Sequence, residues 1–202
     1  MAETNVHEGE FMLEAPDDAS LDISDAFSVC AWIRLDEMVS YSATIVGKGM
    51  STGYSVGVFS GGSYDCPDPT ANRYVRVTVE GAAAGFTLAP HVDCGTGAWR
   101  HIVVTVSTES GGEHTATLYL DGAPAGTISF AGTFTNNDAP LGIGNDGELN
   151  SPFAGAIDDV RLYDRVLSAD EAADIYASIW IDGFESGSSS AWSSSVPTSS
   201  AR

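Results

Sequence analysis

Positive charge is scarce in this sequence. The chain has 8 lysine and arginine residues against 28 aspartate and glutamate residues, which gives a formal net charge of −20, and Lys48 is its one lysine. A surface of this sign repels nucleic acids and anionic bilayers. The composition therefore predicts no nucleic-acid partner and favours neutral or cationic ligands and divalent cations.

Long apolar runs are also missing. No stretch approaches the roughly 20 residues that a membrane-spanning helix needs, so no membrane insertion is expected. No signal peptide is visible, and the acidic start Met1-Ala2-Glu3 is typical of a chain whose leader has been removed. The 202 residues, 43% of them hydrophobic, suffice for one packed domain.

Cysteine is limited to three residues, and their spacing does not fit a zinc site. Cys66 and Cys94 lie in polar, loop-like sequence, whereas Cys30 lies in an apolar stretch. The economical pairing is a Cys66–Cys94 disulfide with Cys30 as a buried free thiol. Such a bridge would stabilise the fold by about 3–4 kcal/mol. It would also place the protein in an oxidising compartment, secreted or at the cell surface.

The chain contains many short segments that are typical of strands, and in several of them apolar and polar residues alternate. These are Phe11–Ala15, Phe27–Leu35, Ala43–Val46, Tyr54–Phe59, Tyr74–Glu80, Ala82–Leu88, Trp99–Ser107, Thr115–Leu120, Thr127–Phe130, 140–144 and 153–163. Asp121-Gly122 is a hairpin signal, and a capping box at Ser168–Glu171 begins the one convincing helix, through about Ala177. The pattern predicts an all-β fold: an antiparallel two-sheet β-sandwich or jelly roll with one short C-terminal helix. We expect it to span residues 1–181, followed by a Ser-rich tail or linker at 182–202.

The last predicted strand, 153–163, contains an acid that needs a partner. Strict alternation places Asp158 on the same face as Val160 and Leu162, and therefore in the core. Burying an unpaired carboxylate costs several kcal/mol, so Asp158 should meet a cation or several N–H donors. A bound metal, with calcium as the candidate, is one interpretation. The other is a carboxylate at the rim of the sandwich, solvated or bonded to loop amides.

A second set of oxygen ligands precedes this strand. Asn145, Asp146 and Glu148 surround Gly147, and oxygen ligands on a glycine-containing loop suit calcium. Asn145 and Asp146 are therefore further candidate metal ligands. An acidic hairpin turn is the alternative.

A candidate ligand-binding surface lies around the loop 60–73. Aromatic rings together with Asp and Asn side chains provide what a sugar site needs, a flat apolar face and directed acceptors. An ordinary loop contains the same residue types, so both interpretations stay open. Trp32 and Trp99 are expected in or near the core. The residues that would form the site are Tyr64, Asp65, Asn72 and Arg73 in the loop, with Tyr41 and Tyr54 in neighbouring turns.

Five motifs occur in an order that resembles a known family. They are Phe27–Ile33 (FSVCAWI), Ile45–Lys48 (IVGK), Trp99–Thr105 (WRHIVVT), Leu118–Gly122 (LYLDG) and Phe153–Ser168 (FAGAIDDVRLYDRVLS). Across roughly residues 8–177 the chain resembles the laminin-G-like branch of the concanavalin A-like lectin/glucanase fold. The resemblance implies two curved antiparallel sheets and a calcium ion at the sandwich rim. It implies Asp158 as the first side-chain ligand, with Glu8 and Glu10 as further candidates.

Catalysis is not expected. The glucanase members of this fold carry Glu-x-Asp-x-x-Glu on one strand, which holds two carboxyl groups ~5 Å apart in retaining enzymes, and this chain has no such run. The sequence therefore predicts a secreted, non-catalytic recognition domain that binds carbohydrate and holds a structural calcium. One alternative is a protein-adhesion or self-assembly module of a larger cell-surface protein, with an extracellular protein or a second copy as partner. Another is a glycoside hydrolase with an atypical acid pair.

Overall fold

The computed structural model describes residues 12–23, 25–49, 53–61, 66, 73–79, 82–85, 92–145 and 151–181. The elements in this part of the chain are mostly strands, with one 3-10 helix (η1) and one α-helix (α1). In chain order they are β1 (Leu13–Ala15), η1 (Ala19–Leu21), β2 (Ala26–Glu37), β3 (Ser42–Lys48), β4 (Tyr54–Ser60), β5 (Arg73–Val79), β6 (Ala82–Gly85), β7 (Arg100–Thr108), β8 (Glu113–Leu120), β9 (Ala123–Ala131), β10 (Leu141–Ile143), β11 (Ala154–Tyr163) and α1 (Ala169–Ile181). None of the described helices is both long and apolar enough to cross a bilayer.

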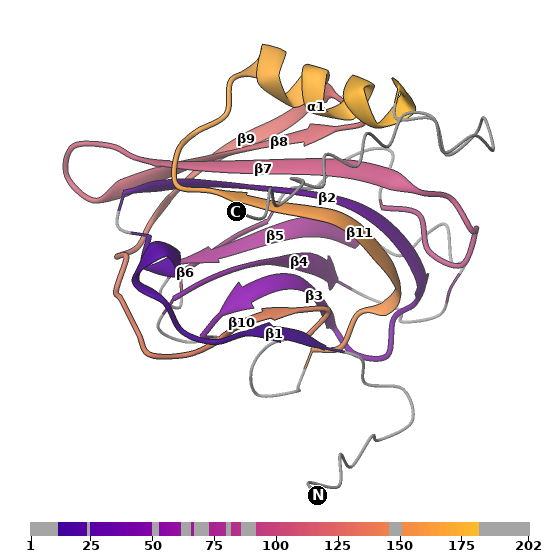
Figure 1. The fold of residues 1–202 in the computed structure, drawn as a ribbon, viewed down its shortest axis with the longest axis horizontal. Coiled ribbons are helices and arrows are strands. Elements are labelled where there is room, and N and C mark those ends of the chain that lie inside the picture. Colours follow the sequence, from indigo (N-terminus) through magenta and orange to yellow (C-terminus); the bar gives the residue numbers. More distant parts are fainter. Residues whose placement is uncertain are drawn as a thin grey trace, which may run out of the picture.

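The strands form two antiparallel sheets that lie one over the other (Figure 1). One sheet has six strands in the order β1-β10-β3-β4-β5-β6, and the other has five in the order β11-β2-β7-β8-β9. Early strands pair with late ones, β2 with β11 and β3 with β10, so the chain crosses repeatedly between the sheets. The predicted two-sheet sandwich is confirmed.

The core lies between the sheets and follows the alternation of each strand. Phe27, Val29, Ala31 and Ile33 of β2 are all buried, as their spacing predicts. They face the inward valines of the six-stranded sheet, Val56, Val58, Val75 and Val77. Full burial of each such side chain contributes about 1.5–3 kcal/mol relative to exposure, so this cluster dominates the stability of the fold.

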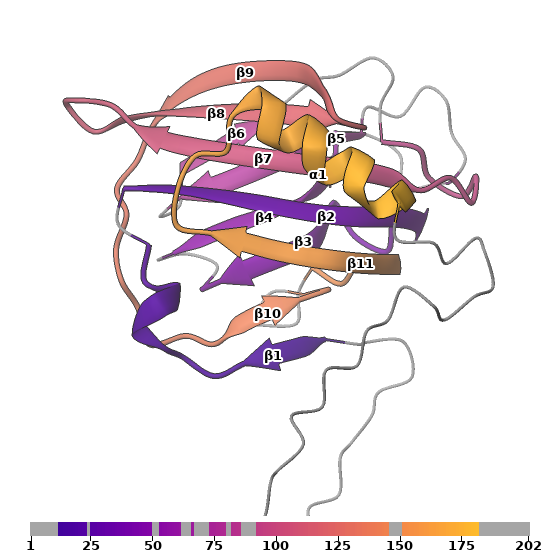
Figure 2. The ribbon, with the colours of Figure 1, turned by 45° about the horizontal axis from the view of Figure 1, so that its top comes forward.

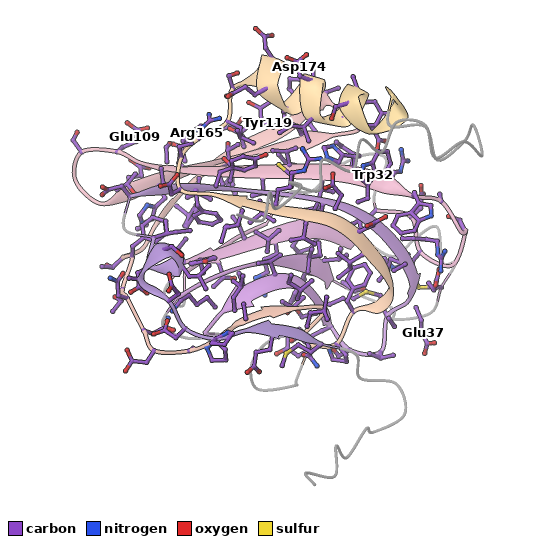
Figure 3. All side chains as sticks on the ribbon, in the orientation of Figure 1. Trp32, Glu37, Glu109, Tyr119, Arg165 and Asp174 are labelled. Atoms are coloured by element: carbon purple, nitrogen blue, oxygen red, sulfur yellow. A yellow bond between two sulfur atoms is a disulfide. The ribbon has the colours of Figure 1, made fainter. Side chains whose placement is uncertain are left out.

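Helix α1 covers the outer face of the five-stranded sheet (Figure 2). The predicted capping box begins it: the Ser168 N–H donates to Glu171 Oε2 at 2.8 Å, and the Glu171 N–H donates to Ser168 Oγ at 3.2 Å. Beneath the helix, Tyr119 and Cys30 form a second, smaller core, and Trp32 stacks on Tyr176 at 5.6 Å. Figure 3 shows Trp32 and Tyr119 between the sheet and α1. The outer face of the six-stranded sheet carries no described helix.

The predicted disulfide is present. Cys66 and Cys94 are bonded, with their Cα atoms 5.3 Å apart, and Cys30 is a buried free thiol whose pKa is raised by burial to about 12. The backbone of Cys94 also forms an isolated parallel β-bridge with Leu35, near the end of β2. The disulfide therefore joins Cys66, which comes between β4 and β5 in the chain, to a residue beside β2 of the opposite sheet. It also indicates an oxidising, extracellular compartment.

The other end of the sandwich is closed around the single lysine. Lys48 is 2% exposed, and its Nζ donates to Asp17 Oδ1 at 2.6 Å and to the carbonyl oxygen of Asn137. Asp22 lies 3.3 Å away as a second counter-ion. One cation thus joins three segments distant in sequence, and a small pocket beside it is lined by Asp22, Tyr54 and Asn137 among others.

Candidate functional site

The outer face of the six-stranded sheet presents aromatic rings to solvent. In β4 the buried Val58 precedes Phe59, and in β5 the buried Val75 separates Tyr74 from Arg76. Because side chains alternate along a strand, Phe59, Tyr74 and Arg76 all point away from the core. All three are partly exposed, and none of them belongs to the core cluster.

These side chains contact one another in a continuous row. Tyr41, which is 49% exposed, meets Phe59 edge-on with ring centroids 5.6 Å apart, and Phe59 and Tyr74 are tilted at 5.2 Å. The guanidinium carbon of Arg76 lies 4.7 Å from the centroid of the Phe59 ring, within the range of a cation–π contact. We call the surface formed by Tyr41, Phe59, Tyr74 and Arg76 the aromatic face.

Two glycines, Gly57 and Gly85, leave room on the sheet beside the side chains of the aromatic face. Arg76 pairs across the sheet with Gly57 of β4 and Gly85 of β6. A β-carbon added at Gly85 would lie 2.6 Å from Cε2 of Tyr74, so the ring of Tyr74 lies against the backbone of β6. A ring held down on a sheet in this way offers its other side to solvent.

Small hydroxyl-bearing residues continue the surface beyond Arg76. Ser55 pairs with Gly47 on one side and with Thr78 on the other, and both Ser55 and Thr78 are partly exposed. Thr44, which pairs with Gly57, is only 5% exposed and adds no hydroxyl to the surface. The outer face therefore combines aromatic rings, one cation and two hydroxyl groups over a floor of short side chains. Apolar ring faces together with a few directed polar groups are typical of sites that bind small polar ligands such as sugars.

Arg76 differs from four arginines in or next to the five-stranded sheet. Arg34, Arg161 and Arg165 each pair with a carboxylate, at 2.9, 2.7 and 2.7 Å, and Arg100 pairs with two. Arg76 forms no ion pair with any residue that the structure describes. Among the described residues, the contact that its guanidinium makes is the one with the ring of Phe59.

The residues that the sequence proposed for ligand binding divide into three groups. Tyr41 is exposed and belongs to the aromatic face. Tyr54 is buried instead: it packs on Phe27 at 5.1 Å and its hydroxyl donates to the carbonyl oxygen of Leu21 at 3.2 Å. Arg73 is 3% exposed, so its side chain is not displayed on the surface either. The surface positions expected for Tyr54 and Arg73 were wrong, because each is the first residue of its strand and alternation turns it inward, on the same face as the buried valines. Tyr64, Asp65 and Asn72 lie outside the described residues.

The tryptophans depart in part from expectation. Trp32 is partly covered by α1, but Trp99 is 40% exposed, with the guanidinium carbon of Arg34 5.5 Å from its ring centroid. Trp99 precedes β7 rather than lying within it, so no second sheet covers its ring. Placing Trp99 in or near the core was therefore wrong.

Asp158 does not point into the core. A β-bulge shifts the pairing of β11 with β2 between Asp158 and Arg161, and Asp159 has a φ of 47°. The extra residue reverses the alternation, so Ile157 and Val160 both pack on the core while Asp158 is exposed. Its Oδ1 accepts the N–H of Asp159 at 2.8 Å. The inward orientation predicted from strict alternation was wrong.

The described candidates for calcium do not come together as a site. Asn145 is buried and its Oδ1 accepts the N–H of Ser151 at 3.1 Å, an arrangement that closes a loop. Asp158 is exposed and lies further along β11. No group of three or more Asp, Glu, His or Cys side chains within the described ranges could hold a metal. Glu8, Glu10 and Asp146 lie outside those ranges, so calcium stays a prediction that depends on them.

A serine motif missed in the sequence is explained by the fold. Residues 53–57 read Gly-Tyr-Ser-Val-Gly, which matches the Gly-x-Ser-x-Gly pattern of hydrolase nucleophiles. That chemistry needs the serine on a sharp turn from a strand into a helix. Ser55 instead lies within β4, paired with Gly47 and Thr78, so the motif is not a nucleophile elbow here.

The fold defines the class of protein: a concanavalin A-like β-sandwich, in which no described helix lies on the outer face of the six-stranded sheet. Residues 9–173 match a family model, Laminin_G_3, described as the concanavalin A-like lectin/glucanases superfamily. The chain therefore belongs to this superfamily. A search of curated proteins finds no match.

Several solved structures share the fold at low sequence identity. The binding domain of Paraclostridial Mosquitocidal Protein 1 is 16% identical with a TM-score of 0.59, over 84% of this chain and 41% of that one. A heptameric SAP-like pentraxin from Limulus polyphemus is 14% identical with a TM-score of 0.58, over 82% and 80%. Domain 4 of AbnA, an extracellular arabinanase from Geobacillus stearothermophilus, solved with arabinotriose, is 18% identical with a TM-score of 0.56, over 85% and 84%. Identities this low show a common fold, and the chain spans less than half of the first of these structures.

Proposed function

We propose that this domain is a secreted, non-catalytic carbohydrate-binding module and that the aromatic face is its binding surface. The observation that carries the proposal is the ring of Tyr74, which lies against Gly85 of β6 and beside Phe59, on an outer sheet face without a described helix. A sugar presents C–H groups on one side of its ring, and these pack on an aromatic plane. The hydroxyls of Ser55 and Thr78 lie on the same face and can exchange hydrogen bonds with the sugar's own hydroxyls.

The outward positions of β4 and β5 carry no acidic side chains, which supports a binding role over a catalytic one. Glycoside hydrolysis needs two carboxyl groups flanking the scissile bond. The outward positions of β4 hold Ser55, Gly57 and Phe59, and none of these is acidic. Those of β5 hold Tyr74, Arg76 and Thr78, again without an acid.

The structural relatives support the same kind of function. The arabinanase domain was solved with arabinotriose, and the mosquitocidal protein fragment is a binding domain. Both share the sandwich but little sequence, so they support a recognition role without identifying the ligand. The Cys66–Cys94 disulfide supports export.

A glycan array tests the proposal, with Tyr74→Ala compared against the unmodified protein. Losing one stacking ring costs about 1–2 kcal/mol, so affinity for the strongest array glycan should fall roughly 5- to 30-fold. Trp99→Ala is the matched control, because Trp99 is also an exposed ring over which an arginine lies, but it directly precedes β7 of the other sheet. Equal loss in both variants, or no loss in Tyr74→Ala, would contradict the proposed surface.

A second candidate function is adhesion or self-assembly, favoured by the edge strand β1. Its three residues are all exposed, and Leu13 is 72% exposed. An open edge strand can pair with a strand of another chain. Sedimentation analysis over a range of concentrations distinguishes this function, because self-assembly through β1 would raise the mean mass and Leu13→Lys would reverse the effect.

A further inference from the structure

We infer that the ligand of the aromatic face carries a carboxylate and that Arg76 binds it. This inference rests on the proposed function and narrows it to saccharides with an acidic sugar, such as a uronic acid. It follows from the way Arg76 is placed in a strongly acidic protein.

The first argument is charge. The chain has 28 acidic residues, and four other arginines among the described residues have recruited carboxylates from them. Arg76 has no carboxylate within ion-pair distance among the described residues. No described residue accepts a hydrogen bond from its guanidinium. An arginine with unused donors in such a protein is electrostatically complementary to an anion brought from outside.

The second argument is geometry. The two cross-strand neighbours of Arg76 are Gly57 and Gly85, so no side chain stands beside it in its own row. Its guanidinium is instead held against the Phe59 ring, with 4.7 Å between the guanidinium carbon and the ring centroid. An arginine supported on an aromatic plane keeps its N–H groups available for a two-pronged contact with a carboxylate.

The third argument is the neighbourhood. Tyr74 is two residues from Arg76 on the same strand and face, and Thr78 follows at the next outward position. A sugar stacked on Tyr74 would carry its acidic substituent within reach of Arg76 and its hydroxyls over Thr78. Stacking and ion pairing would then act on the same sugar ring.

The net charge of the protein limits the kind of acid. A charge of −20 repels a chain that is acidic at every residue, beyond a screening length of about 8 Å at physiological salt. One carboxylate in an otherwise neutral oligosaccharide avoids that repulsion and still pairs with Arg76. We therefore expect isolated acidic sugars to bind better than polyuronates.

Matched glycan pairs test the inference. Each pair consists of one oligosaccharide ending in glucuronic, galacturonic or sialic acid and the same oligosaccharide without that acid, first on an array and then by calorimetry for the strongest pair. The acidic member should bind more tightly. In Arg76→Gln the acidic member should lose about 10- to 100-fold in affinity, as expected for a charged hydrogen-bonded contact, while the neutral member is unchanged. Arg34→Gln is the control, because Arg34 also lies over an exposed ring but already pairs with Asp36.

The outcomes separate this inference from the function on which it rests. Equal binding of both members, or an unchanged preference in Arg76→Gln, would overturn the inference and leave carbohydrate binding intact. An equal loss for both members in Arg76→Gln would show that Arg76 only supports Phe59, which also overturns it. Binding to no glycan in either class would contradict the proposed function itself. If Arg76→Lys keeps part of the preference for the acidic member that Arg76→Gln loses, this supports a contact based on charge.

Discussion

The ring of Tyr74 rests on Gly85 across the β5–β6 pair, so that a β-carbon at Gly85 would lie 2.6 Å from Cε2 of the ring. Contacts this short do not persist, and the ring would have to move. The glycine is therefore part of the aromatic face although it carries no side chain.

Gly85→Ala should weaken glycan binding without removing any group that contacts the sugar. We expect a loss of the same order as in Tyr74→Ala, roughly 5- to 30-fold, because the displaced ring no longer offers its plane. The measurement is calorimetry with the strongest array glycan. In a Tyr74→Ala background the same glycine substitution should have no further effect, and independent additive losses would show that Gly85 acts in another way.

The disulfide should stabilise the sandwich substantially. Cys66 and Cys94 are separated by 28 residues, and closing a loop of that size is worth about 3–4 kcal/mol in the chain-entropy model. The double variant Cys66→Ala/Cys94→Ala should lose that amount in urea unfolding at pH 7. Cys30→Ala is the control for removal of a thiol that forms no bridge, and a double variant as stable as the unmodified protein would contradict this prediction.

Acid should destabilise the protein partly through His101. Burial lowers its pKa to about 4 from 6.5, against the opposing influence of Asp121 and Asp159. Between about pH 6.5 and 4 the unfolded chain therefore binds a proton that the folded chain excludes. The contribution of His101 is complete above pH 6.5 and is lost as the pH falls, by about 3 kcal/mol over the whole interval.

Urea midpoints of His101→Gln at pH 7 and pH 4.5 check this expectation. The variant should lose less stability than the unmodified protein over that interval, because glutamine does not titrate. If the two proteins lose the same amount, His101 is not a source of acid sensitivity.

Lys48→Met should destabilise the end of the sandwich opposite the disulfide. Removing a buried ammonium leaves Asp17 and Asp22 facing each other without a cation, although both remain partly exposed and can regain water. We expect a loss of about 2 kcal/mol in urea unfolding. Adding Asp22→Asn to this variant should restore part of the loss, and a further loss of stability would contradict the electrostatic explanation.

A structural calcium stays a prediction of the sequence, with Glu8, Glu10 and Asp146 as the candidate ligands that the structure does not describe. If calcium binds, chelation should lower the melting temperature, and saturation at ~100 times the dissociation constant would stabilise by about 2.7 kcal/mol. Asp158→Ala tests the predicted ligand directly: loss of that difference identifies Asp158 as a ligand, and an unchanged difference shows that calcium is held without it. A melting temperature that is the same with calcium and with chelator would contradict the prediction.

The architecture could be predicted because its signals are local. Alternation in β2 placed Phe27 and Val29 in the core, Asp121-Gly122 marked the β8–β9 turn, and the Ser168 capping box fixed the start of α1. The pairing of Cys66 with Cys94 could be predicted because both lie in loop-like sequence and Cys30 does not. Each of these predictions depends on a few adjacent residues.

The site could be predicted only in part because it depends on long-range packing. The alternation of β5 already places Tyr74 and Arg76 on the face of the strand away from Val75. It does not say which of the two sheets α1 will cover. The sequence gives no sign of the bulge at Asp159, which turned Asp158 outward. The burial of Tyr54 depends on which face of β4 packs on the core, and the exposure of Trp99 depends on β7 beginning only at Arg100.

Binding of a glycan to the outer face of β4, β5 and β6 is the central claim, and mapping it by NMR tests it most directly. The strongest array glycan is titrated into isotope-labelled protein, and the amide signals of the backbone are followed. We predict that shifts concentrate in Ser55–Phe59, Tyr74–Thr78 and Gly85, and that β11 and α1 stay unchanged. Shifts confined to the five-stranded sheet, or to the Lys48 end of the sandwich, would contradict the claim.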